Sequence, residues 1–300
     1  MPGVRGLVLA GSIGRGEPWP LSDIDMLPIS AEGIDTEAQI AHRQASLVDW
    51  WAASARAQTL DVGWLRFTDQ EVTQAIGLKP AEAAQLMSDR RWLHGTDKAY
   101  GGRGAADPDG LAEAFAQWAT KIRFEPLVVA ARVKQWKTQV VDARERAIQA
   151  ISCNNPVEAT LGIREAARAL RLVLLESWGE RLGSMGREWT RFERMASAHG
   201  ARHIASQLAA LADAQPEDAL RRARSAPAWL QERIDLAYAG RMAIGETVTP
   251  EQNARDQLAA FAVHVPKRTV QPWGAWMILP ADNLEERLAT LDMLITMIDS

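Results

Sequence analysis

Three short apolar runs near the start of the chain predict the strands of a small sheet. They are Leu7–Ala10, Ile24–Ile29 and Thr59–Leu65, each bounded by glycine or polar residues. Runs of this length are typical of buried strands. Between the second and third runs, Asp35–Arg56 repeats its apolar residues with the period of a helix. This order of strand, helix and strand indicates a small mixed sheet backed by helices.

The rest of the first hundred residues predicts shorter elements. Asp69–Ile76 and Ala81–Met87 have the pattern of two short helices, and Pro80 stands where proline favours a helix start. Arg91–Gly95 predicts a last strand. Gly101–Gly110 then combines glycines, a proline and aspartates that do not easily make a regular element, which indicates a connector between domains.

The pattern that follows the connector is almost wholly helical. Asn155 and Pro156, with Glu158 three residues after the asparagine, have the form of a capped helix start. Repeated apolar faces predict a bundle. The sequence therefore predicts an α+β protein, with a small mixed-sheet domain over residues 1–104 and an all-helical domain over residues 105–300. The expected helices cover residues 111–123, 127–150, 157–178, 188–198, 204–212, 226–244, 250–263 and 284–298.

Composition agrees with two globular domains and excludes some classes of protein. The chain has 300 residues, of which 47% are hydrophobic and 24% charged, as in ordinary soluble proteins. Its one cysteine, Cys153, excludes an intramolecular disulfide and suits a reducing cytoplasm. The start of the chain lacks a signal peptide's pattern, and no segment approaches the about 20 apolar residues of a membrane span. We therefore expect a cytoplasmic protein with no membrane partner.

The charge balance bears on the partner. The formal net charge is −4 and the sequence pI is about 5.8. Proteins that act on DNA or long RNA usually carry a basic surface, so this balance favours a cationic small molecule over nucleic acid. A local basic groove on an acidic protein leaves transfer RNA open as a partner.

The segment with the most candidate chemistry joins the first two predicted strands. Gly11 allows close backbone approach to a ligand, and Ser12 supplies a hydroxyl and an amide to an anion, as phosphate-binding turns do. Arg15 adds a cation, and Ser22 adds a second hydroxyl just before the second strand. The competing interpretation of Arg15 is a solvated loop arginine.

Paired acids follow this loop. Asp23 and Asp25 are two residues apart, so in an extended strand their carboxylates share a face. Two adjacent acids are unfavourable unless a cation lies between them, and such a set of oxygens suits Mg²⁺ with substrate phosphates. Asp61, in the third run, supplies a third acid that could also take a proton from an attacking hydroxyl. The competing interpretations are a solvated strand edge or helix cap for the pair and an exposed strand residue for Asp61.

The glycine-serine pair, the variable loop and the Asp-x-Asp resemble the motif of the DNA polymerase beta-like nucleotidyltransferase superfamily. Within it, the chain is most similar to the aminoglycoside adenylyltransferases of the spectinomycin-streptomycin type. The resemblance implies that residues 1–104 form a nucleotidyltransferase catalytic domain, with Asp23, Asp25 and Asp61 as catalytic residues that bind the metal and Asp61 also as a catalytic base. It also implies that Ser12 and Ser22 contact a triphosphate. That group commonly has glutamate at the position of Asp61, so the base role carries over less directly than the metal role.

The same resemblance implies a function and a second set of contacts. Arg187, at the start of a helix in the second half, resembles in position a family lysine that contacts the triphosphate; the competing interpretation is a surface ion pair. The implied reaction is Mg²⁺-dependent transfer of AMP from ATP to a hydroxyl of a small, cationic acceptor such as an aminoglycoside, which would confer antibiotic resistance. The alternatives are modification of a protein or transfer RNA, as by toxins and antitoxins, and nucleotide binding without catalysis.

One departure from the superfamily is visible. Its members usually have a helix before the first strand, whereas here Val4 to Leu7 begins the strand almost at once. We therefore expect either a sheet covered in another way or a shortened start. Base preference, acceptor and oligomeric state do not follow from the sequence.

Overall fold

The computed structural model describes residues 3–31, 37–53, 60–62, 65–183, 186–263 and 274–299. Contacts within the chain divide it into two compact units, residues 1–132 and 133–300. The division falls inside helix α7, Pro126–Ser152, rather than after Gly104, where the sequence predicts the domain boundary. The protein is of mixed α and β type, as predicted, with a small sheet and many helices.

Within the described part of the first unit, five strands form one mixed sheet. β1 is antiparallel to β2 and to β5, whereas β2 is parallel to β3 and to β4. The strand order is β3-β2-β1-β5, with β4 also paired to β2. The three predicted apolar runs are confirmed as strands, although residues 59, 63 and 64 of the third run lie outside the described residues. The strands are β1 Val4–Leu9, β2 Ile24–Ser30, β3 Leu60–Val62, β4 Phe67–Thr68 and β5 Arg103–Ala105.

The helices of the first unit agree with their end signals. The Thr68 hydroxyl accepts a hydrogen bond from the backbone N–H of Glu71, whose carboxylate in turn accepts from the N–H of Thr68, so a capping box starts α3. Pro80 occupies the first turn of α4. The helices of this unit are α1 Gly11–Gly14, α2 Glu37–Ala53, α3 Asp69–Ile76, α4 Pro80–Leu86, α5 Arg90–Ala99 and α6 Leu111–Ile122. The predictions of α2, α3, α4 and α6 are confirmed, although residues 35, 36 and 54–56 of the helix predicted over 35–56 lie outside the described residues. The sequence did not predict α1 and α5.

Two sequence predictions in this unit are wrong. Arg91–Gly95 is not a strand but lies inside α5, because the Asp89 side chain accepts from the backbone N–H of Arg91 and caps a helix there. Within this helix, residue 95 is glycine where a Cβ would lie 2.5 Å from the ring of Phe67. The expected connector is not irregular throughout, since β5 lies within it and pairs with β1.

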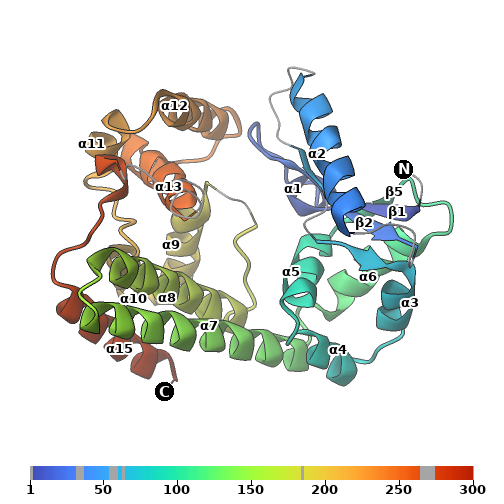
Figure 1. Ribbon diagram of the computed structural model, residues 1–300, viewed down its shortest axis with the longest axis horizontal. Coiled ribbons are helices and arrows are strands. Elements are labelled where there is room, and N and C mark those ends of the chain that lie inside the picture. Colours follow the sequence, from blue (N-terminus) through green and yellow to red (C-terminus); the bar gives the residue numbers. More distant parts are fainter. Residues whose placement is uncertain are drawn as a thin grey trace. The chain divides into compact units, whose positions relative to one another are not determined.

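The core of the first unit lies between the sheet and its helices. Val8 of β1 pairs with Leu27 of β2, so both side chains share the face that also carries Ile29, and all three are fully buried. Helices α3, α5 and α6 contact this sheet, as Figure 1 shows for α5 and α6. Phe67 packs against Trp92 of α5 with ring centroids 4.4 Å apart. One face of the sheet is thus covered by helices.

The described residues of the second unit form helices joined by loops, and none of them lies in a strand. The Asn155 side chain accepts from the N–H of Glu158 and Pro156 follows in the first turn, so the predicted start of α8 is confirmed. The predicted helix over 226–244 corresponds to α12, whereas α11 was not predicted. The helices after α7 are α8 Pro156–Ser177, α9 Glu188–Ala198, α10 Arg202–Leu211, α11 Ala219–Arg224, α12 Ala228–Ala243, α13 Pro250–Ala262, the 3-10 helix η1 Ala275–Met277 and α15 Leu284–Asp299.

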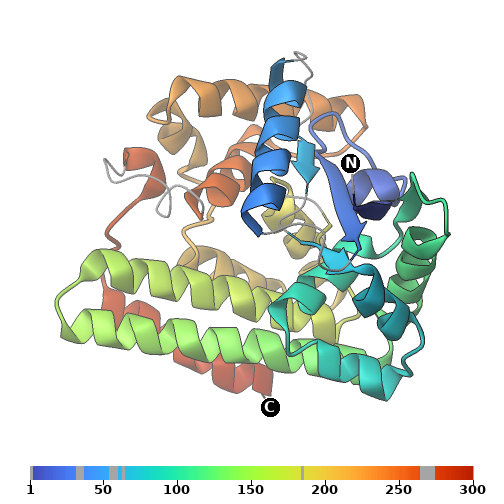
Figure 2. The ribbon, with the colours of Figure 1, turned by 45° about the vertical axis from the view of Figure 1, so that its right-hand side comes forward.

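Close contacts hold the long helices of this unit together. A Cβ on Gly162 of α8 would lie 2.9 Å from the carbonyl oxygen of Ala143, so glycine lets α7 and α8 approach, and the two helices run side by side in Figures 1 and 2. Arg144 of α7 forms an ion pair with Asp292 of α15. Among the described helices, none has the length and apolar character that crossing a membrane would require.

Candidate active site

The turn after β1 brings Gly11 against the carboxylate of Asp25. Gly11 has a φ of +62°, a conformation that residues with a side chain rarely adopt. A Cβ built on it would lie 1.8 Å from Asp25 Oδ2, so no side chain fits there. The backbone N–H of Ala10 donates to the carbonyl of Asp25 over 2.9 Å, which fixes the turn to β2. The structure therefore brings together the glycine and one acid of the predicted motif.

The two predicted serines meet in the same loop. Ser12 Oγ donates to Ser22 Oγ over 2.8 Å, although ten residues separate them in the chain. Ser22 Oγ also accepts from the backbone N–H of Trp19 over 3.0 Å. Both hydroxyl-bearing residues are buried, as is Trp19. The hydrogen bond between Ser12 and Ser22 thus joins the two ends of the loop between β1 and β2.

The acids lie at the start of β2 and in the neighbouring strand. Asp25 is the second residue of β2, on the face that also carries Leu27, and it is half-buried. Asp23 comes one residue before β2 rather than within it. Asp61 of β3 is the register partner of Asp25 in the parallel pair of strands. The backbone thus places Asp61 beside Asp25, while the side chain of Asp61 lies outside what the structure describes.

A lysine that the sequence analysis missed reaches this site. Lys98 Nζ of α5 lies 2.9 Å from Asp25 Oδ1, and the side chains of Lys98 and Asp25 are only 12% and 14% exposed. The signal that could have found Lys98 was the start of helix α5 at Asp89. Because residues 91–95 were interpreted as a strand, the sequence analysis gave no reason to place Lys98 near β2. In the structure, the Asp89 cap starts a helix that includes Lys98 and contacts β2.

Arg15 lies at the end of the same turn. Its side chain is 4% exposed and its Nε is 3.5 Å from Glu17 Oε2. The aliphatic part packs on the backbone of Gly101, where a Cβ would lie 2.6 Å from Arg15 Cγ. Gly101 has a φ of +65°, so glycine is required there both for the backbone and for the contact. Arg15 is therefore a buried residue of the loop rather than a solvated one.

Arg187 lies in the second unit, where it precedes α9. It is buried, and its guanidinium is 3.6 Å from the carboxylate of Glu246. Burial, with the nearby charge of Arg191, lowers the pKa of Arg187 to about 10, although Glu246 opposes this shift. Arg187 is thus an interior cation with an acidic partner, and its contact with a triphosphate stays a prediction.

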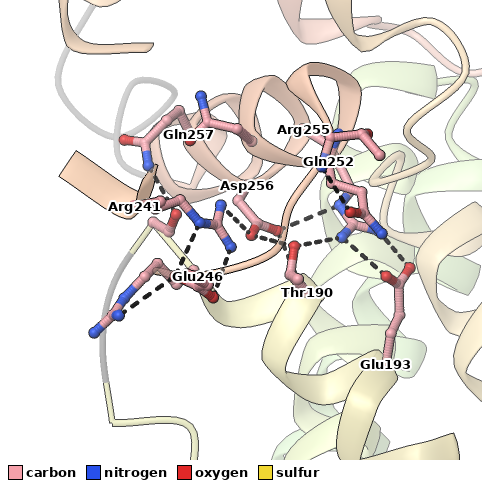
Figure 3. A network of polar contacts seen from close by, with 12 residues as sticks. Thr190, Glu193, Arg241, Glu246, Gln252, Arg255, Asp256 and Gln257 are labelled. Atoms are coloured by element: carbon pink, nitrogen blue, oxygen red, sulfur yellow. Dashed lines mark hydrogen bonds and ion pairs between the residues drawn. The ribbon is translucent and has the colours of Figure 1, made fainter. Parts of the chain in front are cut away.

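Glu246, the partner of Arg187, also pairs with Arg241 and so belongs to a larger buried network of charged residues in the second unit. Figure 3 shows Glu246, Arg241 and Asp256 in this network. Arg241 and Asp256 have no exposed side-chain surface, and their charged groups are 3.0 Å apart. Asp256 also accepts from the hydroxyl of Thr190 over 2.7 Å, and Arg255 pairs with Glu193. Each charge has an opposite partner, which is the condition for burying it.

The donor set of the first unit fits a magnesium ion in kind. Asp23 and Asp25 supply carboxylate oxygens, and the carboxylate of Asp25 occupies the position that a Cβ on Gly11 would take. In the part of the chain that the structure describes, no group of three or more His, Cys, Asp or Glu side chains is placed to hold a metal ion. A third ligand would have to come from Asp61, whose side chain is not described.

Comparison of the chain with models of protein families, with curated proteins and with solved structures found no match. The function of the site therefore has to follow from its own residues.

Proposed function

We propose that the chain is a Mg²⁺-dependent nucleotidyltransferase that moves AMP from ATP to a hydroxyl of a small molecule, such as an aminoglycoside-like antibiotic. The observation that carries the proposal is the contact of Gly11 with Asp25, beside the register pair of Asp25 and Asp61. A glycine turn packed on a strand acid would bring backbone N–H groups for a phosphate and a carboxylate for a cation to one point.

The loop residues would bind the triphosphate. The hydrogen bond between Ser12 and Ser22 orders the turn before a ligand arrives, so less entropy is lost when a phosphate binds. Backbone N–H groups of a turn and a serine hydroxyl are the usual donors to phosphate oxygens. Arg15, buried in the same loop, contributes a positive charge that favours an anion.

The acids would serve the reacting centre. Asp23, Asp25 and Asp61 would hold Mg²⁺, which supplies neutralisation of the charge that builds up on phosphate oxygens. Asp61 takes the proton of the acceptor hydroxyl as its oxygen attacks the α-phosphorus in line. The bond between the α-phosphorus and the bridging oxygen breaks, and pyrophosphate leaves with that oxygen. The products are the adenylylated acceptor and pyrophosphate.

The acceptor is proposed from charge. The net charge of −4 favours a cationic, hydroxylated compound over a polyanion. An aminoglycoside has both the hydroxyl groups and the positive charge.

Pyrophosphate release tests the proposal. Each nucleoside triphosphate is incubated with Mg²⁺ and with a panel of aminoglycosides, lincosamides and transfer RNA. We expect release with ATP and a small cationic acceptor, and none from Asp25→Asn. Asp49→Asn, which removes an exposed carboxylate of α2, is the matched control and should keep full activity. If pyrophosphate were released only with transfer RNA, the proposed small-molecule acceptor would be wrong. If the protein bound nucleotide but released no pyrophosphate with any acceptor, the proposed catalytic function would be wrong.

A further inference from the structure

The ion pair between Lys98 and Asp25 lies at the centre of the proposed site. Lys98 Nζ is 2.9 Å from Asp25 Oδ1. Gly11 covers the other carboxylate oxygen, since the position of its missing Cβ is 1.8 Å from Asp25 Oδ2. The two carboxylate oxygens of Asp25 thus have different neighbours. Oδ1 is paired with the Lys98 ammonium, and Oδ2 lies against the backbone of Gly11.

This pair is shielded from solvent. With side-chain exposures of 12% and 14%, neither charge is well hydrated, so the ion pair contributes to the stabilisation of both. A lysine ammonium is a compact charge on a flexible stem, which can change partners without moving the helix that carries it. Lys98 is the next-to-last residue of α5, where the stem starts from a fixed backbone.

We propose that Lys98 is a built-in counter-ion that competes with the divalent cation for Asp25 and transfers to the triphosphate when the metal binds. The inference rests on the proposed function, because it needs both a metal and a phosphate at this site. A divalent cation on Asp25 repels the ammonium, and the attraction between Asp25 and Lys98 has to be given up. Phosphate oxygens bound at the turn of Gly11 would offer the displaced ammonium a new anion.

If Lys98 exchanges partners in this way, removing its charge changes the affinity for the metal and the affinity for the nucleotide in opposite directions. Removing a purely structural lysine would not have this result. Removing the charge of Lys98 takes away the competitor, so a divalent cation alone binds more tightly. The same change takes away a contact with the phosphates, so the nucleotide binds more weakly. A lysine that only stabilised the fold would weaken both, because a loosened site binds neither ligand well.

The experiment measures both affinities in the same variants. Mn²⁺ binding without nucleotide is followed by electron paramagnetic resonance, and binding of a non-hydrolysable ATP analogue is followed at saturating Mg²⁺. For Lys98→Met we expect about tenfold tighter Mn²⁺ binding, equal to about 1.4 kcal/mol, and about tenfold weaker binding of the analogue. The matched control is Lys121→Met, which removes the same charge from an exposed position on α6 and should change neither affinity.

The outcomes separate this inference from the proposed function. Equal Mn²⁺ affinity in wild type, Lys98→Met and Lys121→Met overturns the exchange and leaves the metal site standing. Mn²⁺ binding that is absent from the wild type, or unchanged in Asp25→Asn, overturns the proposed site itself. Circular dichroism checks folding, and Lys98→Gln repeats the test with a side chain that can still donate to Asp25. If neither Lys98 variant folds, Lys98 cannot leave Asp25 during function, which also overturns the exchange.

Discussion

Substitution of Gly11 by alanine tests whether the turn after β1 and the acid of β2 form one unit. The new Cβ would lie 1.8 Å from Asp25 Oδ2 and 2.7 Å from its carboxyl carbon, distances at which atoms cannot coexist. The Asp25 side chain therefore has to rotate away from the turn. Rotation breaks its ion pair with Lys98 and moves the carboxylate out of the site.

Gly16 provides a matched control in the same loop. Its φ is +74°, close to the +62° of Gly11, but a Cβ there would have no atom within 4 Å. Gly16→Ala should lower the free energy of unfolding by about 1 to 2 kcal/mol, the cost of a left-handed backbone. Gly11→Ala has the same backbone cost and also breaks a largely buried ion pair, so we expect a loss of about 4 to 7 kcal/mol in total.

Urea unfolding and Mn²⁺ binding, measured on both variants, complete the test. Gly16→Ala should bind Mn²⁺ and release pyrophosphate as the wild type does, whereas Gly11→Ala should lose both properties while remaining folded in the absence of urea. If Gly11→Ala bound Mn²⁺ and turned over as well as Gly16→Ala, the contact of Gly11 with Asp25 would have no part in the site.

Three further perturbations address other parts of the protein. Ser22→Ala removes the acceptor of the Ser12 hydroxyl and should lower the free energy of unfolding in urea by about 1 to 3 kcal/mol, with weaker nucleotide binding; unchanged stability would contradict the buried pair. Burial, with the charge of Arg90, lowers the pKa of His94 to about 4, so the folded state binds its proton less readily than the unfolded chain. The free energy of unfolding should then fall by up to about 3 kcal/mol as the pH drops from 6.5 to 4, and His94→Gln should flatten this slope. Arg241→Met leaves Asp256 with one fewer buried partner and should lower the free energy of unfolding by about 3 kcal/mol, measured by urea unfolding. An unchanged free energy of unfolding would show that the pair contributes nothing to stability.

The sequence predicts this protein best where local signals agree. The apolar runs of β1 and β2, and helices such as α3 with its Thr68 capping box, follow from patterns within a few residues. The same holds for α9, whose observed bounds Glu188–Ala198 are those predicted. Gly11 was singled out for close backbone approach, and the approach proved to be to Asp25.

Prediction fails where a distant contact decides the structure. Residues 91–95 looked like a strand ending in glycine, but Gly95 belongs to a helix whose surface fits the ring of Phe67. The run after Gly101 looked like a connector, yet part of it pairs with β1, a contact between residues far apart in the chain. Lys98 was missed for the same reason, because its partner Asp25 is fixed by how α5 packs on the sheet rather than by any local pattern.

The central claim is that the glycine-serine turn and the acids of two adjacent strands bind a divalent cation together with a nucleotide's phosphates. Anomalous scattering from Mn²⁺, in crystals grown with a non-hydrolysable ATP analogue, tests it most directly. We expect an anomalous peak within bonding distance of carboxylate oxygens of Asp25 and Asp61, with the phosphates against Gly11 and Ser12. A nucleotide bound elsewhere, or a manganese peak remote from Asp25, would contradict the account.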